Sequence, residues 1–129
     1  MKIEQRLADR TLTDAQVAAI AAKLKPFPGQ QFEFVTYWDL KEAVNIGSRI
    51  SVALAVAGWT FVPQKTWSAM TSRLAGVVVY DQPNSSETTK EAAIALVSAL
   101  NSEDISAELR AGNDTKLNNK ITIAVGEKP

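Results

Sequence analysis

Two strand–helix–strand patterns follow one another along the chain, and they restrict its fold more than any other feature of the sequence. The first has an aromatic-rich run over 32–38, an apolar helix over 39–57 that ends at Gly58, and a short apolar run over 59–62. A strand, a helix and a second strand in this order form a parallel pair with a right-handed crossover. This segment therefore predicts one complete βαβ unit.

The second pattern begins with the run Val77–Tyr80, which is continuously apolar and therefore typical of a strand buried on both faces. A helix over about 87–101 and a half-exposed strand over 105–109 follow it. Residues 121–125 then alternate between apolar and polar as a fifth strand. We therefore expect a five-stranded sheet that is mixed and mainly parallel.

The helix over 39–57 is apolar on most of its surface, because Val44, Val52 and Val56 extend beyond its main apolar stripe. A helix of that kind is usually buried on more than one side. The predicted fold is therefore α/β, a three-layer sandwich of the Rossmann-like or flavodoxin-like type, with this helix sandwiched between other elements. A ferredoxin-like α+β arrangement is the alternative.

A chain of 129 residues suits a single domain, which we place at 13–129. Thr13 and Gln16 have the spacing of a capping box, which marks the start of the first helix of that domain. Residues 1–12 are predicted to be the end of a helical stalk. A homo-oligomer formed through this N-terminal helix is a further expectation.

The chain contains no histidine and no cysteine. Their absence excludes disulfides, thiolate nucleophiles and Ser-His relays, so we expect no catalytic residues, no metal and no cofactor. The 14 basic and 14 acidic residues give a formal net charge of zero, and they are interspersed along the chain. Nucleic acid is not an expected partner, because its binding requires cations clustered on one face.

The candidate binding site lies in the loops that follow two of the predicted strands. Ligands of open parallel sheets bind beyond the carboxyl ends of the strands, and a helix N-terminus near residue 87 would offer N–H groups to a phosphate or carboxylate. Ordinary helix capping explains the same polar residues and is the alternative. The candidate ligand-binding residues are Trp38, Asp39, Asp81, Asn84, Ser85 and Ser86.

An acidic site is a second interpretation of these loops. Asp39 and Asp81 could converge at the strand ends with Lys128 nearby, an arrangement that suits Mg²⁺ and a phosphoryl group. Asp39 is also well placed as the N-cap of the helix that follows it, which is its ordinary structural role.

Several short motifs are spread along most of the chain, at Arg10, Leu12, Thr13, Gln16, Leu24–Gly29, Ala57–Trp59, Val125, Gly126, Lys128 and Pro129. Together they resemble the motifs of an uncharacterised bacterial domain. In proteins of that family, transmembrane and coiled-coil segments come first, and this α/β domain forms the soluble C-terminal tail. The resemblance implies an architecture and a membrane-anchored parent protein, with this domain on the cytoplasmic face. It implies no activity and no catalytic residues.

The function that the sequence favours is a noncatalytic binding or regulatory domain with an unknown protein partner or small ligand. Contact with a membrane would come only through an upstream segment absent from this sequence. Two alternatives stay open. One is a small Mg²⁺-dependent enzyme that handles a phosphate or nucleotide, and the other is a structural self-assembly domain, which zero net charge favours.

Overall fold

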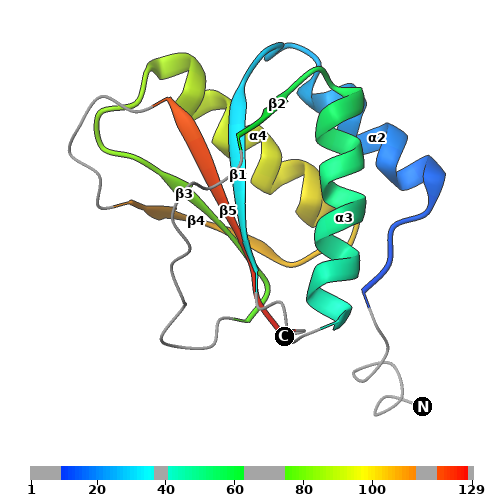
Figure 1. Ribbon diagram of the computed structural model, residues 1–129. Coiled ribbons are helices and arrows are strands. Elements are labelled where there is room, and N and C mark those ends of the chain that lie inside the picture. Colours follow the sequence, from blue (N-terminus) through cyan, green and yellow to red (C-terminus); the bar gives the residue numbers. More distant parts are fainter. Residues whose placement is uncertain (1–9, 37–40, 63–74, 113–118, 128–129) are drawn as a thin grey trace.

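In the part of the chain that the structure describes, all the strands belong to one sheet; two helices pack against it, and a third helix packs against these two (Figure 1). The computed structural model describes residues 10–36, 41–62, 75–112 and 119–127. The five strands of the sheet follow the order β2-β1-β5-β3-β4.

The two strand–helix–strand units form the two halves of this sheet. The first consists of β1 (Gln31–Thr36), α3 (Lys41–Val56) and β2 (Thr60–Phe61). The second consists of β3 (Val77–Asp81), α4 (Glu87–Ser102) and β4 (Ala107–Ala111). In both units the two strands pair in parallel, as their order along the chain predicts.

Strand β5 (Lys120–Val125) joins the two halves at the centre of the sheet. It runs parallel to β1 and antiparallel to β3. The sheet is therefore mixed and mainly parallel, and the predicted α/β fold class is confirmed. The ferredoxin-like alternative does not fit, because three of the four strand pairings are parallel.

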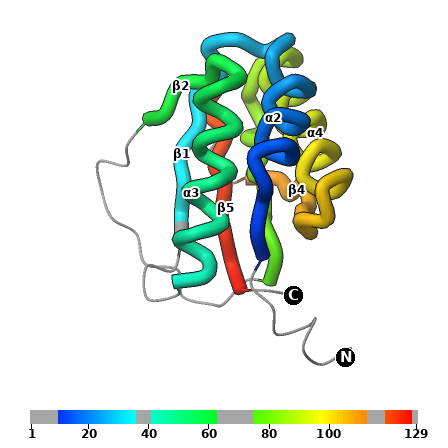
Figure 2. Tube along the Cα trace, turned by 90° about the vertical axis from the view of Figure 1, so that its right-hand side faces the viewer, coloured from blue at the N-terminus to red at the C-terminus, as the bar shows by residue number. Residues whose placement is uncertain are grey.

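The elements form an α/β sandwich, but the described helices do not cover both faces of the sheet as they do in a flavodoxin-like fold. All three helices of the described residues lie on one face of the sheet (Figure 2). The reason is the reversal at β5, because the second unit runs opposite to the first and also steps outward in the opposite direction. Both crossovers are right-handed. When the strand direction and the direction of the step to the next strand are both reversed, a right-handed crossover places its helix on the same face of the sheet as before. In a flavodoxin-like sheet only the step reverses, so its helices occupy both faces.

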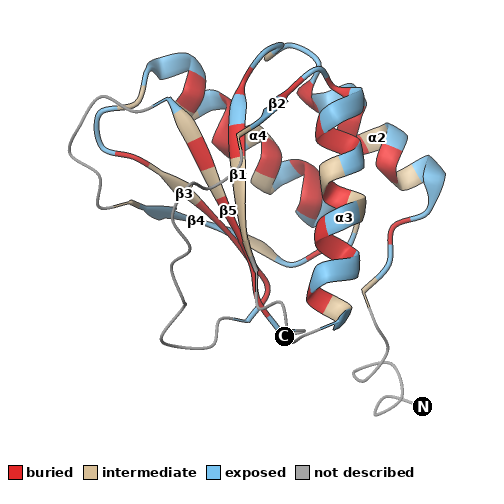
Figure 3. Ribbon diagram, viewed as in Figure 1, coloured by how far each residue is buried: buried red, intermediate tan, exposed pale blue. Residues whose placement is uncertain are grey.

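The core lies between this face of the sheet and the helices (Figure 3). Helix α2 (Asp14–Leu24) packs against both α3 and α4, and its Ile20 and Leu24 are fully buried there. Helix α3 lies between the sheet and α2, as the extent of its apolar surface predicts, but it is not buried on every side. Its residues Val44, Val52 and Val56 are exposed, and they extend the apolar surface of α3 into solvent.

Local sequence signals place several of these elements. Thr13 and Gln16 form the predicted capping box of α2, in which each side chain accepts a hydrogen bond from the other residue's backbone N–H. Trp59 is buried, and its indole N–H donates to the carbonyl of Leu24 at 3.2 Å, which fixes α2 against the start of β2. Gly58, with φ of 89°, occupies the left-handed conformation expected just after a helix.

Several predictions fall outside the described residues. These are the stalk before Arg10, the residues Trp38 and Asp39, the segment over 63–74 and Lys128. In the part of the chain that the structure does describe, no helix is long and apolar enough to span a bilayer.

Candidate functional site

The turn after β3 holds Asp81 and Ser85, two of the predicted ligand-binding residues. The Ser85 hydroxyl donates to a carboxylate oxygen of Asp81 at 2.7 Å, and Lys90 Nζ lies 3.4 Å from the other oxygen. Lys90 also donates to the carbonyl of Gln82 at 3.2 Å. These contacts lie within one turn and the helix that follows it, so this part of the predicted site is occupied by its own neighbours. Asn84 is an exposed residue of the same turn.

Ser86 is the N-cap of α4. Its hydroxyl oxygen accepts from the Thr89 N–H at 3.2 Å, and its own N–H donates to the side-chain oxygen of Asn119 at 2.8 Å. The buried Thr89 hydroxyl donates to Gln30 at 3.2 Å, and Gln30 donates to the carbonyl of Asn119 at 2.6 Å. This network joins the helix start to β1 and β5. Capping, the structural alternative for this cluster, accounts for the observed contacts.

The two predicted halves of the strand-end site lie at opposite ends of the strands, because β1 and β3 run in opposite directions. Thr36, the last residue of β1, pairs with Val125, and Val125 also pairs with Val77, the first residue of β3. The carboxyl end of β1 therefore lies beside the beginning of β3. Trp38 and Asp39 follow β1 but lie outside the described residues. The described geometry thus does not favour the convergence of acidic groups that a magnesium site would need.

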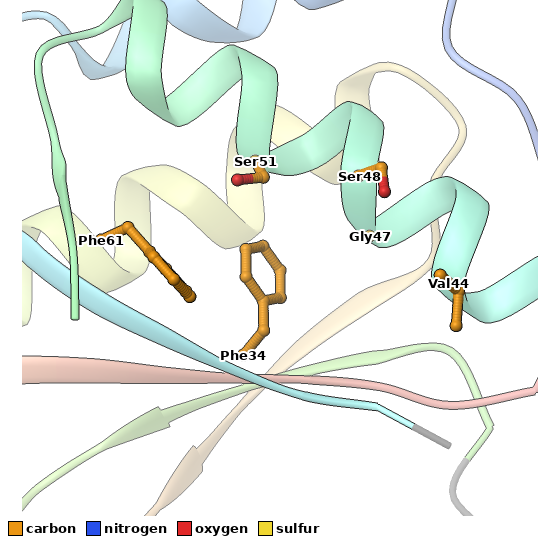
Figure 4. Close-up of a pocket in the computed structure, with 6 residues that line it drawn as sticks. All are labelled: Phe34, Val44, Gly47, Ser48, Ser51 and Phe61. Atoms are coloured by element: carbon orange, nitrogen blue, oxygen red, sulfur yellow. The ribbon is translucent and has the colours of Figure 1, made fainter. Parts of the chain in front are cut away.

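A groove between α3 and the first two strands was not among the predicted sites. It holds a hollow of about 220 Å³ lined by six residues (Figure 4). The rings of Phe34 and Phe61 form its floor, and Phe61 is 53% exposed. The lining residues are Phe34, Val44, Gly47, Ser48, Ser51 and Phe61.

The aromatic floor of this groove is positioned by Phe32, which is buried in the core. The Phe32 ring lies 5.6 Å from that of Phe34 in an edge-on arrangement and 5.7 Å from that of Phe61. Such edge and tilted contacts are favourable for aromatic pairs. Above the floor, Gly47 has no side chain to fill the space between α3 and β1. The groove is therefore held open by buried residues on one side and a glycine on the other.

The backbone of β1 faces this groove at its outer edge. Val62 N–H donates to the carbonyl of Phe32 at 2.8 Å, so the backbone groups of Phe32 point away from β5. Because these directions alternate along a strand, the N–H and C=O of Phe34 also point outward. Strand β2 pairs with only two of the six residues of β1. Among the described residues, pairing with this edge ends at Val62, one step before Phe34.

A partly buried ion pair between Arg10 and Glu42 fixes the N-terminal end of α3. Arg10 donates through Nη2 to one oxygen of Glu42 at 2.6 Å and through Nε to the other at 2.8 Å. Arg10 Nη2 also reaches the carbonyl of Gly126 at 2.6 Å, so the segment before α2 is tied to α3 and to the end of β5. This contact places the first turn of α3, and therefore Val44, over the sheet.

The groove has weak signals in the sequence. The valines of α3 and the aromatic residues of the first strand are both apparent in the sequence, but the apolar surface of the helix predicts burial on more than one side. The early end of β2 also has a signal, because Pro63 has no backbone N–H with which to continue a strand. What no sequence pattern indicated was that these features lie together.

No family model, no curated protein and no solved structure matches this chain. Within the described ranges, no cluster of acidic side chains has the arrangement of a metal site.

Proposed function

We propose that this domain is a noncatalytic binding module that captures an extended, apolar segment of a partner protein. The segment adds as a strand to the outer edge of β1, beyond the end of β2. The observation that carries this proposal is the outward-facing backbone of Phe34 beside the groove that its own side chain lines.

Strand addition uses both features at once. Main-chain hydrogen bonds to an open sheet edge supply affinity, and pockets for alternate side chains supply specificity. A peptide in line with β2 would exchange hydrogen bonds with Phe34 and Thr36. Every second side chain would point under α3, where an apolar group covers Phe34 and Phe61. The hydroxyls of Ser48 and Ser51 lie beside the same space.

Binding accounts for the polar residues better than catalysis does. Asp81, Ser85 and Ser86 make their hydrogen bonds within their own turn, its helix or the adjoining network. The chain also offers no histidine or cysteine as a proton carrier or nucleophile. No described contact favours the Mg²⁺-dependent alternative.

The resemblance to the C-terminal domain of bacterial membrane-anchored proteins supplies a setting for this proposal. In that setting, the domain would recruit its partner to the cytoplasmic face of the membrane.

The test uses the full chain and a panel of short peptides that carry valine, leucine or phenylalanine at alternate positions and threonine between them. Binding is followed by nuclear magnetic resonance, and the expected shifts map to Phe34, Gly47 and Ser51. The variant Ser51→Phe fills the groove without altering the β1 backbone. We expect it to weaken binding by about tenfold or more, because the pocket for the apolar side chain is lost.

The matched control is Ser98→Phe, which places the same ring on an exposed position of α4. This variant should bind the peptides as the unaltered chain does. Equal losses in both variants, or shifts that map away from α3 and β1 for every peptide, would contradict the proposal.

A further inference from the structure

The opposite edge of the sheet, formed by β4, has the properties of a self-complementary surface. Its sequence is Ala-Glu-Leu-Arg-Ala over 107–111, and Glu108 and Arg110 stand on either side of Leu109. If two copies of this strand pair in antiparallel fashion about Leu109, each Glu108 lies opposite an Arg110 of the other copy. We propose that β4 is the interface of a symmetric homodimer, in which two sheets join edge to edge.

The backbone directions of β4 fit this pairing. Val77 N–H donates to the Ser106 carbonyl at 2.9 Å, and Gly112 N–H donates to the Asp81 carbonyl at 2.8 Å. Ser106 and Gly112 therefore face β3. Because backbone directions alternate along a strand, the N–H and C=O of Leu109 face outward. Two copies of Leu109 can thus exchange a pair of hydrogen bonds across the two-fold axis.

The charges meet at the closer positions of this ladder. When the two Leu109 residues form the hydrogen-bonded pair, Glu108 and Arg110 of opposite copies form the neighbouring pairs, whose side chains approach more closely. Within one chain, Arg110 Nη2 lies 2.6 Å from Glu108 Oε1, and both side chains are about half exposed. The hydrogen bond and the charge of Glu108 raise the pKa of Arg110, so the guanidinium stays charged. Dimerisation would extend this pair into a four-charge network.

The other face of the interface is apolar. Leu109 is 40% exposed, and Ile94 of α4 is 56% exposed. Ile94 lies on the same side of α4 as Lys90 and Asn101, which contact the ends of β3 and β4. A two-fold axis perpendicular to the sheet keeps the helices of both copies on one face. It therefore brings Leu109 and Ile94 of each copy toward those of the other and removes apolar surface from water.

Asn101 competes with this pairing at one position. Its side-chain amide donates to the Ala107 carbonyl and accepts from the Ala107 N–H, both at 3.0 Å, as an adjacent strand would. Antiparallel pairing about Leu109 places Ala111 of the second copy at that position. The exposed Asn101 side chain must therefore turn away, and its two bonds are replaced by two between strands. This competition, together with the small size of a single strand edge, predicts a weak and reversible dimer.

Charge reversal tests the register directly. The mass of the full chain is measured by analytical ultracentrifugation at low salt and at concentrations up to about 1 mM, where a small interface associates measurably. Arg110→Glu places like charges opposite each other and should raise the dimer dissociation constant by about tenfold or more. The double variant Glu108→Arg/Arg110→Glu restores the opposite pairs and should restore the dimer. Lys41→Glu changes the net charge as Arg110→Glu does, and it should leave the dimer unchanged.

A cysteine provides a second readout, because the chain has none of its own. In a hydrogen-bonded antiparallel pair the two Cα atoms lie about 5.5 Å apart, within the range of a disulfide. Leu109→Cys should therefore cross-link on mild oxidation, whereas Val52→Cys, on exposed α3, should not. A monomer at every concentration would overturn the proposal, and so would a dimer that Arg110→Glu leaves intact or that the double variant fails to restore. These results do not depend on peptide binding at β1.

Discussion

The two strand–helix–strand units share one design and differ at their outer strands. In the second unit, β4 pairs with all five residues of β3. In the first, β2 pairs with only two of the six residues of β1. Among the described residues, the first unit therefore leaves an open backbone edge beside an apolar groove, whereas the second ends in a full strand with paired charges. The same unit thus produces two kinds of sheet edge, depending on the length of its last strand.

The chemistry of the two edges follows from a few residues. Pro63 comes two residues after the end of β2, and proline cannot donate to a strand ladder. At the other edge, Glu108, Arg110 and the Asn101 amide protect β4 against indiscriminate pairing, because charged and capped edges disfavour it. The open edge accordingly suits an apolar partner, and the charged edge suits only a partner of matching charge order.

The largest effect on stability is expected within β1, where Phe32 pairs with β2 and Phe34 lies beyond the end of β2. Phe32 is 1% exposed, so Phe32→Ala should lower the free energy of unfolding by about 3–5 kcal/mol through lost burial and an unfilled cavity. Phe34→Ala should cost less, about 2 kcal/mol or below, because its ring borders the groove. Urea denaturation of both variants measures the difference. Equal losses would mean that the groove is packed like the core.

The next effect concerns the link that holds α3 over the groove. Glu42→Leu leaves the guanidinium of Arg10, whose side chain is 8% exposed, without its carboxylate, and should cost about 3 kcal/mol. The double variant Arg10→Met/Glu42→Leu removes both charges and should recover most of that loss. Thermal and urea denaturation of the three chains test this. If the double variant is as unstable as the single one, the cost arises from packing and not from the unpaired charge.

The smallest effect is expected at the protected edge. Asn101→Ala removes the two hydrogen bonds to Ala107 and should lower the stability of the monomer by about 1 kcal/mol. The same variant should strengthen self-association, because the competitor for Ala107 is gone. Ser98→Ala, an exposed change on the same helix, serves as the control for both measurements. A dimer weakened by Asn101→Ala would show that Asn101 belongs to the interface.

Much of the fold could be predicted because its signals are local. Apolar alternation, helix caps and Gly58 gave five strands and three helices close to their observed bounds. The strand over 105–109 is the largest shift, since β4 begins two residues later, at Ala107. The layering could not be predicted in the same way. It depends on the direction of β5 against β3, a pairing between strands far apart in sequence that no local pattern encodes.

In the candidate site, too, the local features could be predicted from the sequence, and the features that depend on pairing between distant strands could not. The sequence places Ser86 at a predicted helix start, and the capping alternative accounts for its contact with Thr89. The strand-end hypothesis assumed that β1 and β3 point the same way, and their opposite directions separate their ends. The groove was missed because an exposed valine and a buried one look alike in a sequence. Val44 is exposed because β2 ends early and does not extend beneath it, and the sequence of α3 itself does not indicate this.

The most direct test of the account is the hydrogen exchange rate of the Phe34 amide, measured with and without a bound alternating peptide. The neighbouring amides of Glu33 and Val35 face β5 and serve as internal references. We predict that Phe34 exchanges faster than both in the unbound domain and slows strongly when the peptide binds, while Glu33 and Val35 stay unchanged. A Phe34 amide already as protected as its neighbours, or one unaffected by bound peptide, would contradict strand addition at β1.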